Sequence, residues 1–192
     1  PQWRGPNRDG ISTDTGLLKS WPAKGPALAW KVRSLGKGYS SVAVVAGRIF
    51  SMGESGDTSH LYALDLNGKP LWSAKLGKAG ERGGYFGPRA TPTVAGNMVY
   101  ALGQYGDLIC VDAASGQEKW RKNLKKDFAG EVGGWGYSES PLVDGKRLIC
   151  SPGGNQGTVM ALDSTSGELI WRSTDFKDSA EYSSPIIAEA FG

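Results

Sequence analysis

The sequence predicts an all-β fold, a β-propeller built from four-stranded antiparallel blades. A turn motif that closes on tryptophan occurs three times, with aspartate at Asp65, Asp112 and Asp163. These aspartates lie 47 residues apart (112 − 65) and 51 residues apart (163 − 112), and glycine recurs every 49 residues at positions 47, 96 and 145. Repeats of about 40–50 residues that contain several short strands are typical of propeller blades. The structural residues of the repeat are Asp65, Trp72, Asp112, Trp120, Asp163 and Trp171.

The residues of each turn favour a tight hairpin. The pair Asn67-Gly68 is a strong signal for a type I′ turn, which needs positive φ at both central residues. The other copies place glycine one residue later, at Gly116 and Gly167, which suits a longer turn with a left-handed glycine. We expect the aspartate to accept hydrogen bonds from the turn amides. We expect the tryptophan to pack between neighbouring units and to donate its N–H to a backbone carbonyl.

The chain divides into an irregular segment at residues 1–28, rich in proline and glycine, and a partial propeller at residues 29–192. Trp3 and Trp21 are costly to leave in water, so we expect the first segment to lie against the propeller body. Residues 28–32 resemble the last strand of a unit, with Trp30 in the closing position. The expected strands are 41–45, 48–52, 61–65 and 70–74, then 93–95, 98–102, 108–112 and 118–122, then 142–143, 147–151, 159–163 and 169–173, with a fourth unit opening at 184–187.

About three complete blades and two partial ones cannot close a ring, because propellers close with 4–8 blades. We therefore expect the remaining blades to belong to a longer chain of the same protein. The alternative is self-association, in which copies of this chain complete the ring.

Composition and charge exclude several classes of function. The chain has 22 basic and 19 acidic residues, scattered along its length, and a net charge of +3. This pattern contains neither the basic cluster expected of a nucleic-acid-binding surface nor a polybasic segment that would bind a membrane. No apolar run approaches the roughly 20 residues that a membrane span needs. Cys110 and Cys150 are expected to be buried free thiols, with a disulfide as the alternative.

The connections of an up-and-down blade place the long loops on one face. The blade-to-blade crossings at residues 36–41, 80–92, 130–141 and 181–185 share that face with the loops between second and third strands, and they are rich in glycine and aromatic residues. Binding residues concentrate on such loops. The alternative is that the aromatic side chains only plug the central channel and pack between blades. The candidate ligand-binding residues are Tyr39, Tyr85, Arg89, Trp135, Tyr137, Glu139 and Tyr182.

No residue is assigned to catalysis or to metal binding. The loops between second and third strands are expected at residues 53–60, 103–107 and 153–157, which makes His60 a solvated loop residue. His60 is the one histidine of the chain, so a site with two histidine ligands cannot form. The sequence also lacks CxxC, HExxH and phosphate-loop motifs.

At the repeated turn the chain resembles the pyrroloquinoline-quinone-like propeller repeat superfamily. The tryptophan docking pattern of that superfamily, Ala-x-Asp-x-x-Thr-Gly-x-x-x-Trp, is matched from Ala161 to Trp171 and more loosely from Asp112 to Trp120. The copy from Ala63 to Trp72 is one residue shorter, and serine replaces the threonine at positions 115 and 166. The opening residues 1–10 and 18–22 resemble those of exported bacterial propellers, in which they follow an export signal. The resemblance covers about residues 28–187.

The resemblance implies about eight blades in the intact protein and a periplasmic or extracellular location. The superfamily includes quinoprotein alcohol dehydrogenases and the outer-membrane assembly lipoprotein propeller. Our leading interpretation is an exported, non-catalytic scaffold that binds a protein, a carbohydrate or a small molecule on its long-loop face. The alternative is a fragment of an alcohol or sugar dehydrogenase that uses pyrroloquinoline quinone (PQQ) and calcium. The vicinal-cysteine disulfide of those enzymes is absent, because Cys110 and Cys150 are not adjacent.

Overall fold

The computed structural model describes residues 2–188, which form strands and loops without helices. Three antiparallel four-stranded sheets follow one another along the chain, and their strands are paired in sequence order. Each sheet is one blade. Blade 1 contains β1 (Ala43–Val45), β2 (Arg48–Ser55), β3 (Thr58–Asp65) and β4 (Pro70–Lys78); blade 2 contains β7 (Thr93–Ala95), β8 (Met98–Leu102), β9 (Asp107–Asp112) and β10 (Glu118–Asn123); blade 3 contains β11 (Leu142–Asp144), β12 (Arg147–Cys150), β13 (Met160–Asp163) and β14 (Leu169–Arg172).

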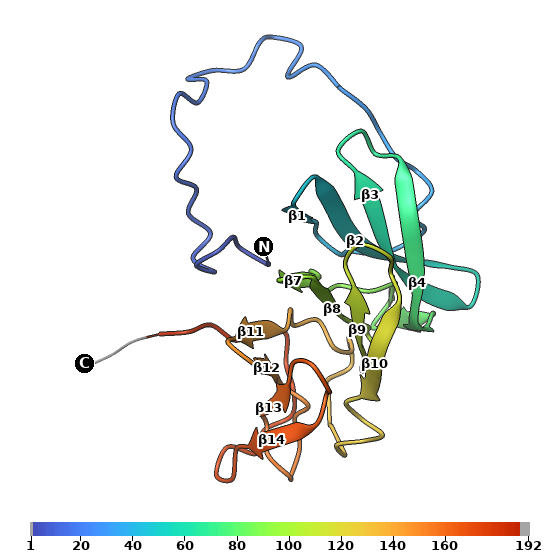
Figure 1. Cartoon of the computed structure of the whole chain (residues 1–192), viewed down its shortest axis with the longest axis vertical. Helices are drawn as coiled ribbons and strands as arrows, with labels where there is room; N and C mark the ends of the chain where they lie inside the picture. Colours follow the sequence, from blue (N-terminus) through green and yellow to red (C-terminus); the bar gives the residue numbers. More distant parts are fainter. Residues whose placement is uncertain (1, 189–192) are drawn as a thin grey trace.

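The blades are arranged as in a propeller. The first strand of each blade lies nearest the common centre, β7 contacts both β1 and β11, and the fourth strands β4, β10 and β14 lie farther out (Figure 1). This confirms the predicted fold class of an all-β partial propeller with four-stranded antiparallel blades. Among the residues that the structure describes, no helix has the length and apolar character that a membrane crossing requires.

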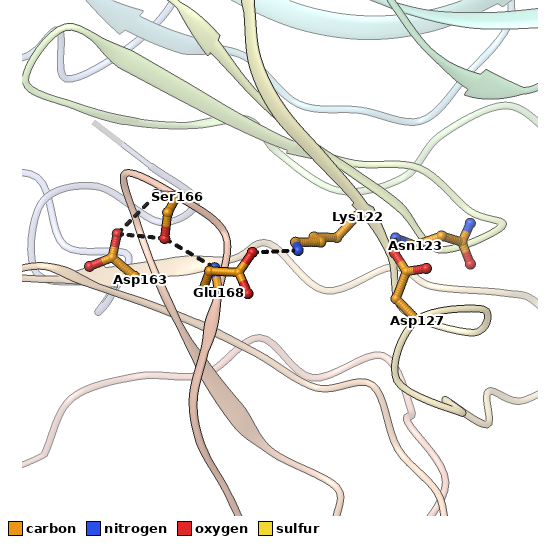
Figure 2. Close-up of polar contacts among 6 residues, drawn as sticks. All are labelled: Lys122, Asn123, Asp127, Asp163, Ser166 and Glu168. Carbon is orange, nitrogen blue, oxygen red and sulfur yellow. Dashed lines mark hydrogen bonds and ion pairs between the residues drawn. The ribbon is translucent and has the colours of Figure 1, made fainter.

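The repeated aspartates close the outer turns. Asp65 Oδ1 accepts hydrogen bonds from the backbone N–H groups of Asn67 and Lys69, each at 2.9 Å. Asp163 Oδ1 accepts from the N–H groups of Thr165 and Ser166, each at 2.9 Å. Figure 2 shows this turn and the ion pair beside it, in which Glu168 of blade 3 meets Lys122 Nζ of blade 2 at 3.0 Å.

Two of the three repeated tryptophans, Trp72 and Trp120, lie between blades. Trp72 of blade 1 donates its Nε1–H to the carbonyl oxygen of Ala113 in blade 2 at 3.3 Å. Trp120 of blade 2 donates in the same way to Ser164 of blade 3 at 3.0 Å. Ala113 and Ser164 each follow the repeated aspartate of their blade, so the two contacts are equivalent.

The rings of Trp72 and Trp120 each lie on the turn glycine of the next blade. A Cβ atom added to Gly116 would lie 2.6 Å from the Trp72 ring, and one added to Gly167 would lie 2.9 Å from the Trp120 ring. Both glycines also have positive φ, 73° and 74°, a region that side chains rarely adopt. Trp30, which precedes blade 1, lies on Gly68 at a corresponding distance of 2.9 Å. Trp171 has no such neighbour among residues 2–188 and is 41% exposed.

One expected loop and two expected strands were wrong. Residues 53–60 form no long loop, because β2 and β3 continue as a ladder to the pair Ser55 and Thr58 and turn at Gly56, where φ is 62°. His60 therefore lies on β3 opposite Gly53, half-buried, and not in a solvated loop. Residues 28–32 and 184–187 form no strand, since neither segment pairs with a neighbouring strand in the described chain.

The N-terminal segment departs from the expected packing. Residues 2–42 contain no strand, and the segment forms a wide arch beside the blades (Figure 1). Trp21 is 68% exposed, so the prediction that it lies against the propeller body was wrong. The backbone hydrogen bonds of residues 2–28 are local turns, such as Gly25 N–H to Pro22 O, and give this stretch no ladder to a blade. The cysteine prediction was correct, because Cys110 and Cys150 are both buried and free.

Candidate functional site: an aromatic arc on the crossing loops

One exposed aromatic residue from each crossing forms a continuous row. Tyr39 and Tyr85 meet edge to face with ring centroids 5.6 Å apart, and Tyr85 meets Trp135 at 6.1 Å. Trp135 meets Tyr182 at 5.6 Å. The four side chains are between 40% and 61% exposed. We call these four residues the aromatic arc.

The arc follows from the blade repeat. Tyr39 precedes β1, Trp135 precedes β11 and Tyr182 follows β14, so one residue stands at each blade boundary. The intervals are 46, 50 and 47 residues (85 − 39, 135 − 85 and 182 − 135), which is the length of one blade. A side chain that recurs with the blade is therefore carried to neighbouring positions around the centre.

A small hairpin that the sequence analysis did not predict supports the arc. Strands β5 (Glu81–Arg82) and β6 (Tyr85–Phe86) pair within the second crossing and present Tyr85. Gly83 lies at the hairpin tip with φ of 58°, and an added Cβ atom would lie 2.0 Å from Cδ1 of Trp135. The Trp135 ring thus lies directly on the hairpin backbone. The signal was present in the pair Gly83-Gly84, a two-residue hairpin connection.

Arg89 lies beneath the arc. It lines a depression of about 280 Å³ together with Tyr39, Tyr85 and Trp135. Its Nη2 donates to the carbonyl oxygens of Arg82 at 2.8 Å and Tyr85 at 3.1 Å, and its Nη1 donates to Gln104 Oε1 at 3.3 Å. Burial lowers the pKa of Arg89 from its usual value. Arg89 therefore holds the hairpin in place and puts a positive charge in the floor of the depression, while its terminal donors bind the chain itself.

Tyr137 and Glu139 lie inside the protein and not on the arc. Tyr137 is fully buried and donates its hydroxyl to the carbonyl oxygen of Pro152 at 2.9 Å. Glu139 is 1% exposed; its Oε1 accepts from the N–H of Ser151 at 2.5 Å, and its Oε2 has no hydrogen-bond partner among the described residues. Burial raises the pKa of Glu139 to about 7, although the Ser151 hydrogen bond and the positive charge of Arg8 oppose this shift.

Arg8 joins the N-terminal segment to the blades, and nothing in the sequence analysis pointed to it. Its guanidinium donates to the carbonyl oxygens of Ser140 at 3.1 Å, Pro141 at 2.5 Å and Pro185 at 2.5 Å. Arg8 is 4% exposed, and burial lowers its pKa to about 10. The contact spans 132 to 177 residues of sequence, and no local pattern around Arg8 could have revealed it.

Within residues 2–188, no group of three or more histidine, cysteine, aspartate and glutamate side chains is placed to hold a metal ion. The arrangement that the structure does offer is a surface of aromatic rings with a cation beneath it. Such a surface binds by burying apolar area and by directed hydrogen bonds at its rim.

The blades and this face define the class of protein: a β-propeller of four-stranded blades whose long loops form one surface. Residues 57–190, more than half of the chain, match the family model PQQ_2, described as outer membrane protein assembly factor BamB. The chain therefore belongs to this family, which confirms the resemblance to PQQ-like propellers.

Relatives and solved structures agree with this assignment. The chain is 28% identical over 148 residues to outer membrane protein assembly factor BamB of Salmonella typhimurium, covering 72% of this chain and 32% of that protein. It is 26% identical over 174 residues to BamB of Yersinia pestis, covering 86% of this chain and 40% of that protein. The chain thus spans less than half the length of these relatives.

Two solved structures show the same fold. BamB from Moraxella catarrhalis superposes with a TM-score of 0.52 at 20% identity, covering 76% of this chain and 39% of that chain. A europium-containing methanol dehydrogenase superposes with a TM-score of 0.53 at 22% identity, covering 76% of this chain and 26% of that chain. At these identities the likeness concerns the fold alone, which is found both in an outer membrane protein assembly factor and in a dehydrogenase.

Proposed function

We propose that the chain is part of an exported, non-catalytic propeller scaffold that binds a protein partner through the aromatic arc. The main support for this proposal is the arc itself. Four half-exposed rings from successive crossings touch one another there, and the charge of Arg89 lies beneath them. Tyrosine, tryptophan and arginine are the residues that dominate protein–protein binding energy. Contiguous exposed apolar surface on a rigid fold marks an interaction site.

The family supports two parts of this proposal: that the partner is a protein, and that the chain is located outside the cytoplasm. The matched relatives bear the name outer membrane protein assembly factor, so we propose a periplasmic or extracellular location and a role in assembling other proteins. A carbohydrate or small molecule remains an outcome of the test and is not part of the proposal.

The proposal includes no quinone or metal. Cys110 and Cys150 are buried, free and separated in sequence, so they cannot form the vicinal disulfide that the dehydrogenase alternative implies. The described residues also offer no group of metal-ligating side chains.

Site-specific photocrosslinking in the native host tests the proposal. A photoreactive phenylalanine analogue at Tyr85 should yield one defined protein adduct, and Trp135→Ala should weaken it because the two rings touch. The matched control is the same analogue at Leu66, which is also about half exposed but lies at an outer turn away from the crossings. Equal adducts at both positions, or none at Tyr85, would contradict the proposal. Dye-coupled alcohol oxidation on adding PQQ and calcium would favour the dehydrogenase alternative.

A further inference from the structure

A second feature of the long-loop face is a groove of about 850 Å³ between blades 1 and 2. One wall comes from the end of β4 and the turn between β2 and β3, and the other from β10 and the residues that follow it. Most of the charged side chains along the groove are basic. The basic residues are Lys75, Lys78, Arg121, Lys125 and Lys126, and the acidic ones are Asp57 and Asp107.

The four lysines carry an excess of positive charge that the chain does not neutralise. All four are exposed, and none of them takes part in an ion pair within residues 2–188. Arg121 also lines the groove, but it is already paired with Glu118 at 2.7 Å and donates to the carbonyl oxygens of Lys75 and Leu76. The free charge therefore comes from lysines, two on each wall.

The floor of the groove is fixed by close contacts between the blades. A Cβ atom added to Gly77 would lie 2.1 Å from Asp107 Oδ2, so the two blades touch there. Asn123 Nδ2 donates to Asp107 Oδ1 at 3.1 Å, which occupies part of this carboxylate. Lys78 Nζ lies 5.5 Å from the centre of the Tyr105 ring. These contacts join blades 1 and 2 at the groove.

Tyr105 links the groove to the hairpin that supports the aromatic arc. The Tyr105 hydroxyl donates to the carbonyl oxygen of Glu81 at 3.1 Å, and Glu81 begins the hairpin that presents Tyr85. Arg82 of the same hairpin lies over the Tyr105 ring at 5.8 Å and donates to the carbonyl oxygen of Gly133 at 3.1 Å. A single extended partner can therefore contact both surfaces.

We propose that this groove binds an acidic polypeptide segment in extended conformation. Side chains on one face of an extended chain recur about every 6.4–6.8 Å, and those between them point to the opposite face, so the carboxylates of one segment can approach lysines on both walls. Lysine contributes a flexible point charge, which suits carboxylates at variable positions. The choice of a polypeptide, and not another polyanion, rests on the proposed function and on the link to the arc.

The test is the fluorescence anisotropy of a labelled peptide of alternating glutamate and serine, titrated with the 192-residue chain. We expect saturable binding at about 0.05 M NaCl and loss of binding at about 0.5 M, because salt screens exposed charges. Changing all four groove lysines to glutamine should weaken binding at least about fourfold, since each exposed ion pair that is lost weakens binding by about 1.4- to 5-fold. The matched control changes the same number of exposed lysines outside the groove, Lys19, Lys24, Lys69 and Lys177, to glutamine.

A substitution that makes the groove more positive distinguishes an effect of charge on binding from an effect of unfolding. Asp57→Asn removes a negative charge from the groove and keeps the oxygen that accepts from Thr58, so the peptide should bind about twofold more tightly. Asp175→Asn, on an exposed loop outside the groove, should leave binding unchanged.

Three results would overturn the proposal: no binding at low salt, equal loss in the groove and control variants, or binding to vesicles of phosphatidylglycerol without binding to the peptide. The Trp135→Ala variant can still bind the peptide while Tyr85 gives no crosslinks. That result would support the proposal for the groove and contradict only the proposal that the aromatic arc binds a partner.

Discussion

Trp120→Ala tests whether the repeated tryptophan joins neighbouring blades. Trp120 is 8% exposed, and its Nε1 donates to Ser164 O at 3.0 Å. Removing a buried aromatic side chain costs about 3–5 kcal/mol. Ser164 O keeps a partner after the change, because the Tyr100 hydroxyl also donates to it at 3.1 Å. The loss therefore comes from packing, and we expect a value in the lower half of that range.

Trp171→Ala is the matched control, because Trp171 holds the same repeat position in blade 3. It is 41% exposed and donates to no carbonyl among the described residues, so the expected cost is about 1 kcal/mol. Urea unfolding of the 192-residue chain, followed by circular dichroism, gives both free energies of unfolding. Equal losses for the two variants, or a loss below about 1 kcal/mol for Trp120→Ala, would refute the role of this ring between blades.

Two further predictions concern buried contacts. Gly167→Ala should cost about 1–3 kcal/mol more than Gly145→Ala, because both glycines have positive φ but only the added Cβ at Gly167 meets the Trp120 ring, at 2.9 Å; equal costs in urea unfolding would contradict the contact. Burial raises the pKa of Glu139 from 4.5 to about 7, so the folded protein keeps a proton that the unfolded chain loses. The free energy of unfolding should therefore fall by on the order of 3 kcal/mol as pH rises from about 4.5 to 7. Glu139→Gln should remove this dependence of the free energy of unfolding on pH. The measurement is the difference in free energy of unfolding between the two proteins at each pH, and a difference that stays constant with pH would show that Glu139 ionises normally.

The blade architecture could be predicted because its signals are local. The strands Thr93–Ala95 and Met98–Leu102 have the expected bounds, since a short apolar run, a glycine turn and a second apolar run define them within ten residues. The pattern of apolar residues did not predict the strand ends where polar residues continue a ladder, as in the β2–β3 hairpin. Hydrogen bonding to a partner strand extended the sheet there, although the side chains of Ser55 to Thr58 gave no apolar alternation.

The candidate site could be predicted only in part. Trp135, Tyr137 and Glu139 belong to one crossing in the sequence, yet Trp135 is 53% exposed while the other two are buried. The backbone turns between them, because Gly136 has φ of 77° and its N–H bonds to Gly133 O at 3.0 Å. The alternation of an extended strand therefore does not apply. Which aromatic residue faces solvent depends on this turn and on the Gly83 backbone that supports Trp135.

The same blade repeat places two kinds of aromatic residue with opposite consequences. Trp72 and Trp120 lie on turn glycines of the next blade and hold the blades together, whereas Tyr85 and Trp135 recur at the crossings and remain exposed. Stability and the proposed partner binding are thus assigned to different side chains at each blade boundary. Substitution within the arc should change partner binding while the blade contacts remain, because no arc residue donates to or accepts from the tryptophan contacts. A propeller can therefore alter its binding face one crossing at a time and keep its fold.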